Sequence, residues 1–289
     1  MCKSLKIVVT GANGFIAKHL RKYLSEENIE LISISRNDFK HFKYETKIIS
    51  SNYEQKNILK IIQNADALIH LVGIGKQSVN VDYDMINTNL TKRIVNLSII
   101  SRIKKIVFLS GLGVSRNTPL GYFISKYKAE RQIINSGLNF TIFRPSYIVG
   151  NGDLFSKNLK NQMKSGEIIV PGSGSYSIQP IHVSDVVKVI LESVSQSKFN
   201  NKIIDLVGPD YVTFEKYVKL FSKGTKVKIR KINLEHAYHS AIINSKSDFG
   251  IDDLNILIGN FKGNHERLAK ISKIKFQSVL EMLQSGRLL

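Results

Sequence analysis

A tyrosine and a lysine stand four residues apart in the segment GYFISKYKAE, residues 121–130, as Tyr122 and Lys126. On a helix this spacing puts both side chains on one face. A nearby ammonium group favours the phenolate, so Lys126 is expected to lower the pKa of Tyr122 toward the range of a general acid or base. The pair therefore predicts proton transfer, while an ordinary cation beside an aromatic ring is the alternative.

A second cluster lies in VVTGANGFIAKHL, residues 8–20, where β-branched residues give way to two glycines and then to a helical pattern. The first glycine suits a tight turn, the second lets the backbone approach a pyrophosphate, and Ala17 is small enough for helix–strand packing. The helix N-terminus then offers unpaired N–H groups to phosphates. Because the motif follows the first strand, it predicts dinucleotide binding rather than a turn without a ligand. The expected contacts are Gly11, Asn13, Gly14, Phe15 and Ile16.

The end of the second expected strand indicates which dinucleotide binds. That strand ends at Ser35 and Arg36, where NAD-binding proteins usually carry a carboxylate for the ribose hydroxyls. A guanidinium group suits a 2′-phosphate, which a carboxylate would repel. We therefore expect NADP(H), with Lys40 and Lys43 as outer helpers. Asp38 keeps NAD(H) as the alternative, and Arg36 could also be a solvated loop residue.

An alternation of patterns predicts the scaffold that positions these groups. Short β-branched runs alternate with amphipathic segments of helical period, which indicates an α/β fold: a Rossmann-type, doubly wound parallel sheet with helices on both faces. The expected strands are 6–10, 30–35, 47–50, 67–71, 105–109, 140–143 and 203–207, and the expected helices include 17–24, 58–62, 89–100 and 125–134. Tyr122 and Lys126 follow the fifth of these strands, so they should lie at the edge that faces the cofactor, where Lys126 can hold the nicotinamide ribose.

The regular alternation fades after about residue 150. We therefore expect an NAD(P)-binding Rossmann domain over residues 1–150 and a smaller substrate or partner lobe over residues 151–289. The lobe should be interleaved with the sheet, because residues 203–207 resemble its last strand. A further helix is expected to open at Thr213.

The composition limits the classes of protein to which this chain can belong. The chain has 289 residues, of which 43% are hydrophobic, and this is enough for one large α/β domain with a smaller lobe. Cys2 is the single cysteine, which excludes a disulfide framework and suits a reducing compartment. Because the first expected strand follows Met1 closely, we expect no signal peptide, and no apolar run is long enough to span a bilayer. We expect a cytoplasmic protein that could lie peripherally at a membrane.

The formal charge is +19, from 42 Lys and Arg against 23 Asp and Glu, and it suits an anionic partner. Nucleotide phosphates, an anionic membrane surface or membrane complex, and nucleic acid are the candidates, although composition from an AT-rich genome would produce the same charge. No dense basic block is present, so nucleic acid is the least favoured. His236 and His239 lack a carboxylate or cysteine partner, and we expect no metal.

Together these motifs resemble the short-chain dehydrogenase/reductase superfamily, in its extended and atypical branch of NAD-dependent epimerase/dehydratase-like proteins. The family's Thr-Gly-x-x-Gly-x-x-Gly turn matches residues 10–17 except for alanine at the last position, and its catalytic pair matches Tyr122 and Lys126. HLVGIG, INTNLTKRIV and FRPSYIVGNGD are similar to further cofactor-binding segments. The resemblance implies cofactor contacts from Leu71, Val72, Gly73, Asn87, Lys126, Pro145 and Ser146.

Two departures from the family pattern affect function. Leu112 stands where the family places a catalytic Ser or Thr, and Ser110 or Ser115 could take that role, with Ser110 the favoured residue. The acid that meets the adenine amino group in the family is replaced, and Asn52 is the expected substitute. Loss of the partner hydroxyl would slow turnover by orders of magnitude.

Within that branch the chain is similar to relatives of the nucleotide-binding accessory subunit of respiratory complex I. SGLGVS, RPSYIVGNGDLF, GSGSYSIQPIHVSDVV and the C-terminal segment from Phe249 carry this resemblance. It implies NADPH binding without known turnover.

Two functions are therefore open, of which the intact Tyr122 and Lys126 favour the first and Leu112 supports the second. In the first, the protein is an NAD(P)-dependent oxidoreductase or epimerase, in which Tyr122 transfers the proton and hydride passes between nicotinamide and a small-molecule substrate of unknown identity. In the second, it is a non-catalytic NADPH-binding structural or sensory protein on a respiratory or other membrane complex. A homodimer could form through helices 89–100 and 125–134, as in extended members of the family.

Overall fold

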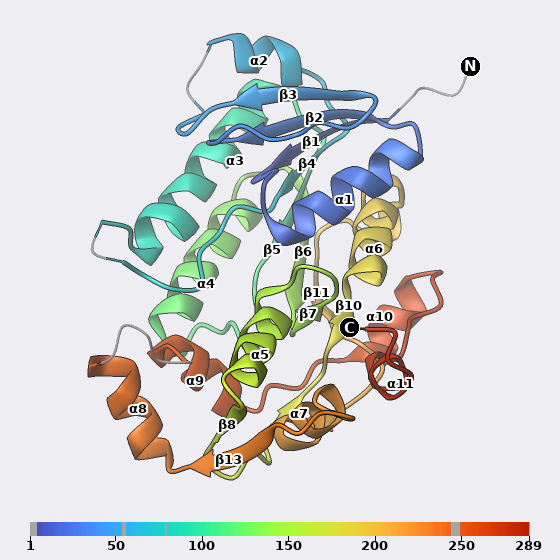
Figure 1. The fold of residues 1–289 in the computed structure, drawn as a ribbon. Helices are drawn as coiled ribbons and strands as arrows, with labels where there is room; N and C mark the ends of the chain where they lie inside the picture. Colours follow the sequence, from blue (N-terminus) through green and yellow to red (C-terminus); the bar gives the residue numbers. More distant parts are fainter. Residues whose placement is uncertain (1–4, 54–55, 79, 244–248, 289) are drawn as a thin grey trace.

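The computed structural model describes residues 5–53, 56–78, 80–243 and 249–288. Within these residues a seven-stranded parallel sheet has the order β11-β6-β5-β4-β1-β2-β3 (Figure 1). Its strands are β1 (Lys6–Thr10), β2 (Glu30–Ser35), β3 (Glu45–Ile49), β4 (Ala67–His70), β5 (Lys105–Leu109), β6 (Asn139–Pro145) and β11 (Lys202–Leu206). The α/β fold with a doubly wound parallel sheet, expected from the sequence, is confirmed.

Helices cover both faces of this sheet (Figure 1). One face carries α1 (Phe15–Glu26) and α6 (Val183–Ser195), and the other carries α2 (Lys56–Ile62), α3 (Leu90–Ile100) and α4 (Gly121–Ile134). All five residues of β5 are buried, as a central strand with two covered faces requires. None of the helices that the structure describes is long and apolar enough to cross a membrane.

The strand order reverses at β1, which pairs with β2 on one side and with β4 on the other. The connections that follow β1 and β4 run to opposite sides of the sheet, so a crevice opens outside the carboxyl ends of these two strands. Thr10 and His70 are paired at these ends. The Gly11–Gly14 turn begins at the same place, which puts it at the crevice.

The second half of the chain adds elements to the large sheet and also forms a separate core of its own. Besides α6 and β11, this half contains three short strand pairs, six helices and one short 3-10 helix. They are β7 (Ile148–Val149), β8 (Glu167–Pro171), β9 (Ser177–Ile178), β10 (Ile181–His182), β12 (Val212–Thr213), β13 (Lys228–Ile232), α5 (Leu154–Lys164), η2 (Ser197–Phe199), α7 (Phe214–Phe221), α8 (Leu234–Ile243), α9 (Ile251–Ile258), α10 (His265–Ile271) and α11 (Val279–Gln284). A separate apolar core forms around Phe214, Tyr217 and Phe221 of α7. In contrast, α6 packs on α1 and β11 pairs with β6, so α6 and β11 belong to the part of the fold that is built on the seven-stranded sheet.

Helices α1 and α2 begin two residues earlier than the apolar pattern predicts, and two further helical segments begin at least four residues earlier. A π-helix, η1 (Asp84–Asn89), precedes α3, and α4 begins at Gly121 rather than at Ser125. The first turns carry polar residues whose side chains bond within the protein: Thr88 donates to Asp84 at 2.9 Å, and Lys128 of α4 donates to the same carboxylate at 2.9 Å. These contacts are partly buried or exposed polar contacts, and hydrophobic periodicity does not detect them. Thr213 caps α7, as expected, by accepting from Lys216 N.

A buried ion pair fixes α1 against the loop before β3. The Arg21 guanidinium donates to both carboxylate oxygens of Glu45, at 2.5 and 2.9 Å, and both side chains are almost fully buried. It also donates to Ala12 O at 2.9 Å and to Lys40 O at 2.8 Å. Arg21 therefore holds the glycine turn and the loop after β2 in one arrangement.

We predict that Arg21→Met lowers the free energy of unfolding by about 3–5 kcal/mol, because it leaves the buried Glu45 carboxylate without its partner. Urea denaturation measures this loss. The matched control is Lys22→Met on the same helix, where an exposed pair with Glu26 at 3.9 Å should contribute less than about 1 kcal/mol. Equal, small losses for the two variants would contradict the role given to Arg21.

Candidate active site

A groove of about 630 Å³ lies at the carboxyl ends of β1, β2 and β4. Gly11 has φ +75°, and a Cβ at this position would lie 3.1 Å from Val72 N. The turn therefore needs glycine both for its backbone conformation and for its close approach to the chain after β4. Of the residues expected to bind the cofactor, the groove is lined by Gly11, Asn13, Gly14, Ser35, Arg36, Leu71, Val72 and Gly73.

Helix α1 opens toward this groove from Gly14, which provides no side-chain cap. The first-turn N–H groups of a helix have no partner within the helix, so they can bind an anion. Phe15 and Ile16 form this first turn and their side chains are half-buried; the Phe15 ring packs against His19 with the centroids 5.2 Å apart. Neither residue belongs to the lining of the groove, so what they can offer a bound anion is the backbone N–H groups of the first turn.

The loop after β2 presents Arg36 to the groove. Its side chain is exposed, and no ion-pair partner is present among the residues that the structure describes. Asp38 is instead paired with Lys47 at 2.8 Å, and this bond lowers the pKa of its carboxyl group. Asn13 donates to Ser35 Oγ at 3.3 Å and to Asp38 O at 3.1 Å, which ties the glycine turn to this loop.

The chain after β3 meets the far end of the groove. Asn52 is exposed and does not belong to the lining, whereas Ser50, Ser51 and Tyr53 do. Tyr53 is buried, adopts φ +62°, and its hydroxyl contacts the backbone of Gly11. Sequence reasoning missed Tyr53; an aromatic residue four positions past the end of β3 was the available signal.

A buried chain of hydrogen bonds runs through His70. His70 Nδ1 lies 2.7 Å from Thr10 Oγ1 and Nε2 lies 3.1 Å from Thr91 Oγ1. Thr91 donates its own proton to Asn87 O at 2.7 Å, so His70 Nε2 must donate to Thr91 and Nδ1 must accept from Thr10. Burial first, and then the charge of Lys126, lower the pKa of His70 to about 3. The imidazole is therefore neutral and connects β1, β4 and α3.

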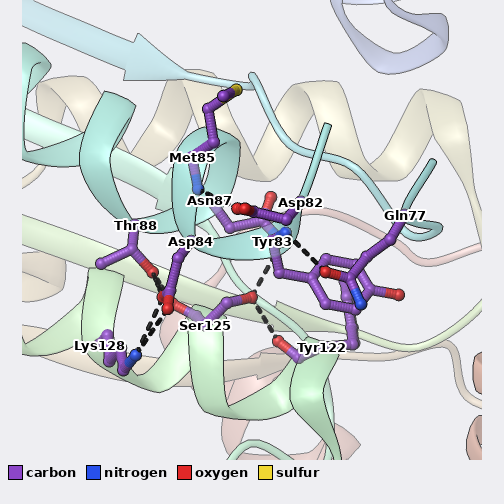
Figure 2. A network of polar contacts seen from close by, with 10 residues as sticks. All are labelled: Gln77, Asp82, Tyr83, Asp84, Met85, Asn87, Thr88, Tyr122, Ser125 and Lys128. Carbon is purple, nitrogen blue, oxygen red and sulfur yellow. Dashed lines mark hydrogen bonds and ion pairs between the residues drawn. The ribbon is translucent and has the colours of Figure 1, made fainter. Parts of the chain in front are cut away.

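Asn87 extends this chain to the helix that carries Tyr122 (Figure 2). Its side chain accepts from Ile74 N at 2.9 Å and donates to Ile74 O at 3.1 Å and to Ser125 Oγ at 3.0 Å. Ser125 in turn donates to Tyr122 O at 2.7 Å. Asn87 thus shapes the loop at the end of the groove instead of lining it, and the π-helix is the element that aims it inward.

Lys126 lies between the groove and Tyr122. Its Nζ donates to Leu109 O at 3.2 Å, and a Cβ at Gly73 would lie 2.8 Å from it. Burial lowers the pKa of Lys126 to about 8. Burial raises the pKa of Tyr122 to about 12, and the negative charge of Asp252 adds a smaller contribution in the same direction. The expected lowering of the Tyr122 pKa by Lys126 is therefore wrong, because desolvation of the phenolate outweighs the ammonium group.

A second, smaller cavity of about 160 Å³ lies beside the Tyr122 side chain. Ser110, Pro145 and Ser146 line it, as does Leu112 in the position of the family's catalytic hydroxyl. Ser110 Oγ is buried without a hydrogen-bond partner among the described residues, whereas Ser115 is exposed and lies outside the lining. Ser110, rather than Ser115, is therefore the hydroxyl that the fold brings to Tyr122.

The described residues contain no group of three or more His, Cys, Asp or Glu side chains that could hold a metal ion. His236 and His239 lie with Glu235 in a separate surface cavity on α8. His182 caps α6 by accepting from Ser184 N. The site therefore combines the groove at the glycine turn with a cavity lined by two phenols, Tyr122 and Tyr147, and three serines, while the buried Lys126 lies beside Gly73 of the groove.

We predict that His70 makes the unfolding free energy depend on pH between about 6.5 and 3. The unfolded chain takes up a proton at His70 near pH 6.5 and the folded protein does so near 3, so stability falls as pH falls through this window. In His70→Gln the slope should be shallower by about 1.4 kcal/mol per pH unit. Urea titrations at several pH values measure it, with His239→Gln as the exposed control. An unchanged slope would contradict a neutral, buried His70.

Comparison with known proteins gives the family. The model of the NAD dependent epimerase/dehydratase family matches residues 7–206, which is more than half of the chain. The NADH dehydrogenase [ubiquinone] 1 alpha subcomplex subunit 9, mitochondrial, of Dictyostelium discoideum is 24% identical over 239 residues, covering 80% of this chain and 66% of that protein. Its mouse counterpart is 23% identical over 223 residues, covering 73% of this chain and 59% of that protein. The chain thus spans less than two thirds of the length of these relatives.

Solved structures show the same fold. A nucleoside-diphosphate-sugar epimerase from Staphylococcus aureus superposes with a TM-score of 0.78 at 17% identity, covering 97% of this chain and all of that one. By the family match over residues 7–206, this chain is a member of the NAD-dependent epimerase/dehydratase family.

Proposed function

We propose that the protein binds NAD(P)(H) in the groove, with the pyrophosphate against the Gly11–Gly14 turn and the first turn of α1. The observation that carries this proposal is the position of the turn: it lies at the β1/β4 reversal, leads into helix α1, whose first-turn N–H groups have no partner within the helix, and borders a groove of about 630 Å³. The residues present fit a dinucleotide, because Gly11 and Gly14 leave the approach open. A UDP-glucuronic acid 4-epimerase of Bacillus cereus, with the same fold at TM-score 0.76 and 15% identity, was solved with NAD.

NADP(H) is the favoured form. Arg36 borders the groove with its guanidinium group free of ion pairs among the described residues, so it can meet a 2′-phosphate. Asp38, the carboxylate that would suit NAD(H), is engaged by Lys47 at 2.8 Å. Both observations support a phosphate-bearing ribose over a free one.

The chemistry we propose is reduction of a carbonyl group. When bound, a reduced nicotinamide supplies the hydride. Tyr122 stays protonated at neutral pH because its pKa is raised to about 12, so its hydroxyl can donate a proton to the substrate oxygen. Ser110 offers a second donor, and Lys126 lies where it can hold the ribose between groove and cavity.

A second candidate function is non-catalytic binding of NADPH on a membrane complex. Leu112 supports it, since the position of the family's partner hydroxyl is apolar and buried. The matches to mitochondrial NADH dehydrogenase subunits support it as well. In this case the cofactor would stabilise the fold, and the charge of +19 would favour an anionic partner surface or the polar face of a bilayer.

We predict that Arg36→Ala weakens NADP⁺ binding about tenfold or more, while NAD⁺ binding changes by less than about twofold, because only NADP⁺ presents a 2′-phosphate to the guanidinium group. Isothermal titration calorimetry measures both. Lys226→Ala removes the same charge from the exposed surface of the second lobe and serves as the control. Equal losses for the two cofactors would overturn the assignment of Arg36.

We predict that Tyr122→Phe retains NADPH binding but loses at least about 100-fold in carbonyl-dependent NADPH oxidation, because the phenol supplies the proton. Single-turnover absorbance at saturating NADPH with a panel of aldehydes and ketones is the measurement. Tyr127→Phe, on the same helix but outside the cavity lining, is the control. Equal rates for wild type and Tyr122→Phe would exclude Tyr122 as the proton donor.

A further inference from the structure

β13 is an edge strand in the second half of the chain. Among the described residues it pairs with β8 alone, in a parallel register that runs from Lys228 opposite Glu167 to Ile232 opposite Pro171. Figure 1 shows β13 at the lower margin of the molecule, with α8 following it. All five residues of the strand are exposed or half-buried. One edge of β13 therefore faces away from the sheet.

This free edge carries backbone groups that no neighbour uses. The backbone N–H of Lys228 donates to Gly166 O at 3.1 Å, which places the backbone groups of Lys228 on the β8 side. Successive residues of a parallel strand point their N–H and C=O groups to opposite sides. Ile229 and Lys231 therefore point theirs outward, where the described part of the chain offers them no partner.

The opposite edge of the same small sheet is covered. Ile169 N of β8 donates to Gln162 Oε1 of α5 at 2.8 Å, and both residues are buried. A side chain of the fold thus takes the place of a neighbouring strand on that edge, whereas none of the described residues does so for β13. A row of unpaired N–H and C=O groups is a template for a further strand.

The free strand and the turn before it are cationic. Five of the nine residues 223–231 are Lys or Arg, a local concentration in a chain whose cations are otherwise scattered. Two of the five are paired with carboxylates of the same lobe, at 2.7 and 2.8 Å. The other three, Lys223, Lys226 and Lys228, are exposed and make no ion pair within the described residues. The edge therefore carries surplus positive charge.

This charge decides which strand can pair with the edge. Lysines on an edge strand prevent two copies of that strand from pairing, because like charges directly opposite each other are destabilising. A second copy of β13 is therefore excluded as the occupant. Carboxylates on an incoming strand would instead be attracted to the unpaired lysines, so the same residues that reject a basic strand favour an acidic one.

We propose that β13 is a docking edge for an acidic, extended segment of a partner protein, which adds to β8 and β13 as a third strand. Backbone hydrogen bonds to Ile229 and Lys231 would hold the segment, and its carboxylates would lie beside Lys226 and Lys228. The inference is independent of the proposed cofactor site, because none of these residues lines the groove.

Two peptide probes, titrated against the full chain, separate strand addition from charge attraction. The strand probe is fluorescein-labelled Glu-Val-Glu-Val-Glu-Val amide, whose alternating valines favour an extended strand. The control probe is fluorescein-labelled Glu-Pro-Pro-Glu-Pro-Pro-Glu amide, which has the same three carboxylates but forms a polyproline helix without alternating N–H groups. Fluorescence anisotropy at low salt should give the strand probe an affinity at least about tenfold higher, through several added hydrogen bonds.

Amide hydrogen exchange, followed by NMR, locates the bound strand. At a strand-probe concentration of about ten times its Kd, exchange of the Ile229 and Lys231 amides should slow about tenfold. The Lys228 amide, which is already bonded to Gly166 O, should change by less than about twofold. This alternation is specific to strand addition at the free edge.

Variants test the charge and the backbone separately. Lys228→Glu should weaken binding of the strand probe at least about tenfold, whereas Lys92→Glu, the same change at an exposed position of α3, should alter it by less than about twofold. Ile229→Pro removes one outward N–H without changing the charge and should weaken binding about fivefold. If the proline variant does not fold, the amide exchange pattern of the wild type tests the same backbone contact.

Equal affinities of the two probes would reveal a surface for anions in general, such as lipid or nucleic-acid phosphates, and would overturn strand addition. Absence of binding by the strand probe would also overturn the proposal and leave the lysines as protection of the edge. Slower exchange at other amides, with Ile229 and Lys231 unchanged, would place the probe elsewhere and contradict the docking edge.

Discussion

The buried hydrogen-bond chain through His70 is the constraint on which the site depends. It joins the ends of β1 and β4, where the sheet reverses, to Thr91 of α3 and so to Asn87. Asn87 then fixes the loop at Ile74 and reaches Ser125 of α4. One neutral imidazole thus sets the distance between the glycine turn and the helix that carries Tyr122. Since each member is buried, loss of one leaves its partners unsatisfied.

The groove and the cavity differ in chemistry. The groove offers backbone N–H groups, an arginine and hydroxyls, which suits phosphates and ribose. The cavity has apolar walls and five residues that carry hydroxyl groups: Ser110, Tyr122, Ser146, Tyr147 and Ser177. Burial keeps Tyr122 protonated and lowers the pKa of the neighbouring Lys126 to about 8. Lys126 lies at the junction of the two. A cofactor whose charged part lies in the groove and whose ring enters the cavity would match this division.

Most strands and helices of the part built on the seven-stranded sheet could be predicted from the sequence. Central parallel strands are continuous apolar runs, and the glycine turn has a local sequence signature. The rest depends on contacts between distant residues. The Tyr83–Asp252 contact, 169 residues apart, and the packing of Phe261 on Gly113 leave no local pattern. The Tyr122 pKa was predicted in the wrong direction because spacing reveals the neighbouring charge but not the burial. Asn52 was predicted to contact the cofactor because of its position after the third strand, but Tyr53 is the residue that lines the groove.

A crystal structure grown with NADP⁺ tests the central claim most directly. We predict that the pyrophosphate lies against the backbone of residues 11–15, the 2′-phosphate lies within hydrogen-bonding distance of Arg36, and the nicotinamide end points toward Tyr122 and Lys126. A groove that stays empty at saturating NADP⁺, or a dinucleotide bound elsewhere on the protein, would contradict the claim that this fold places a working cofactor site at the β1/β4 reversal.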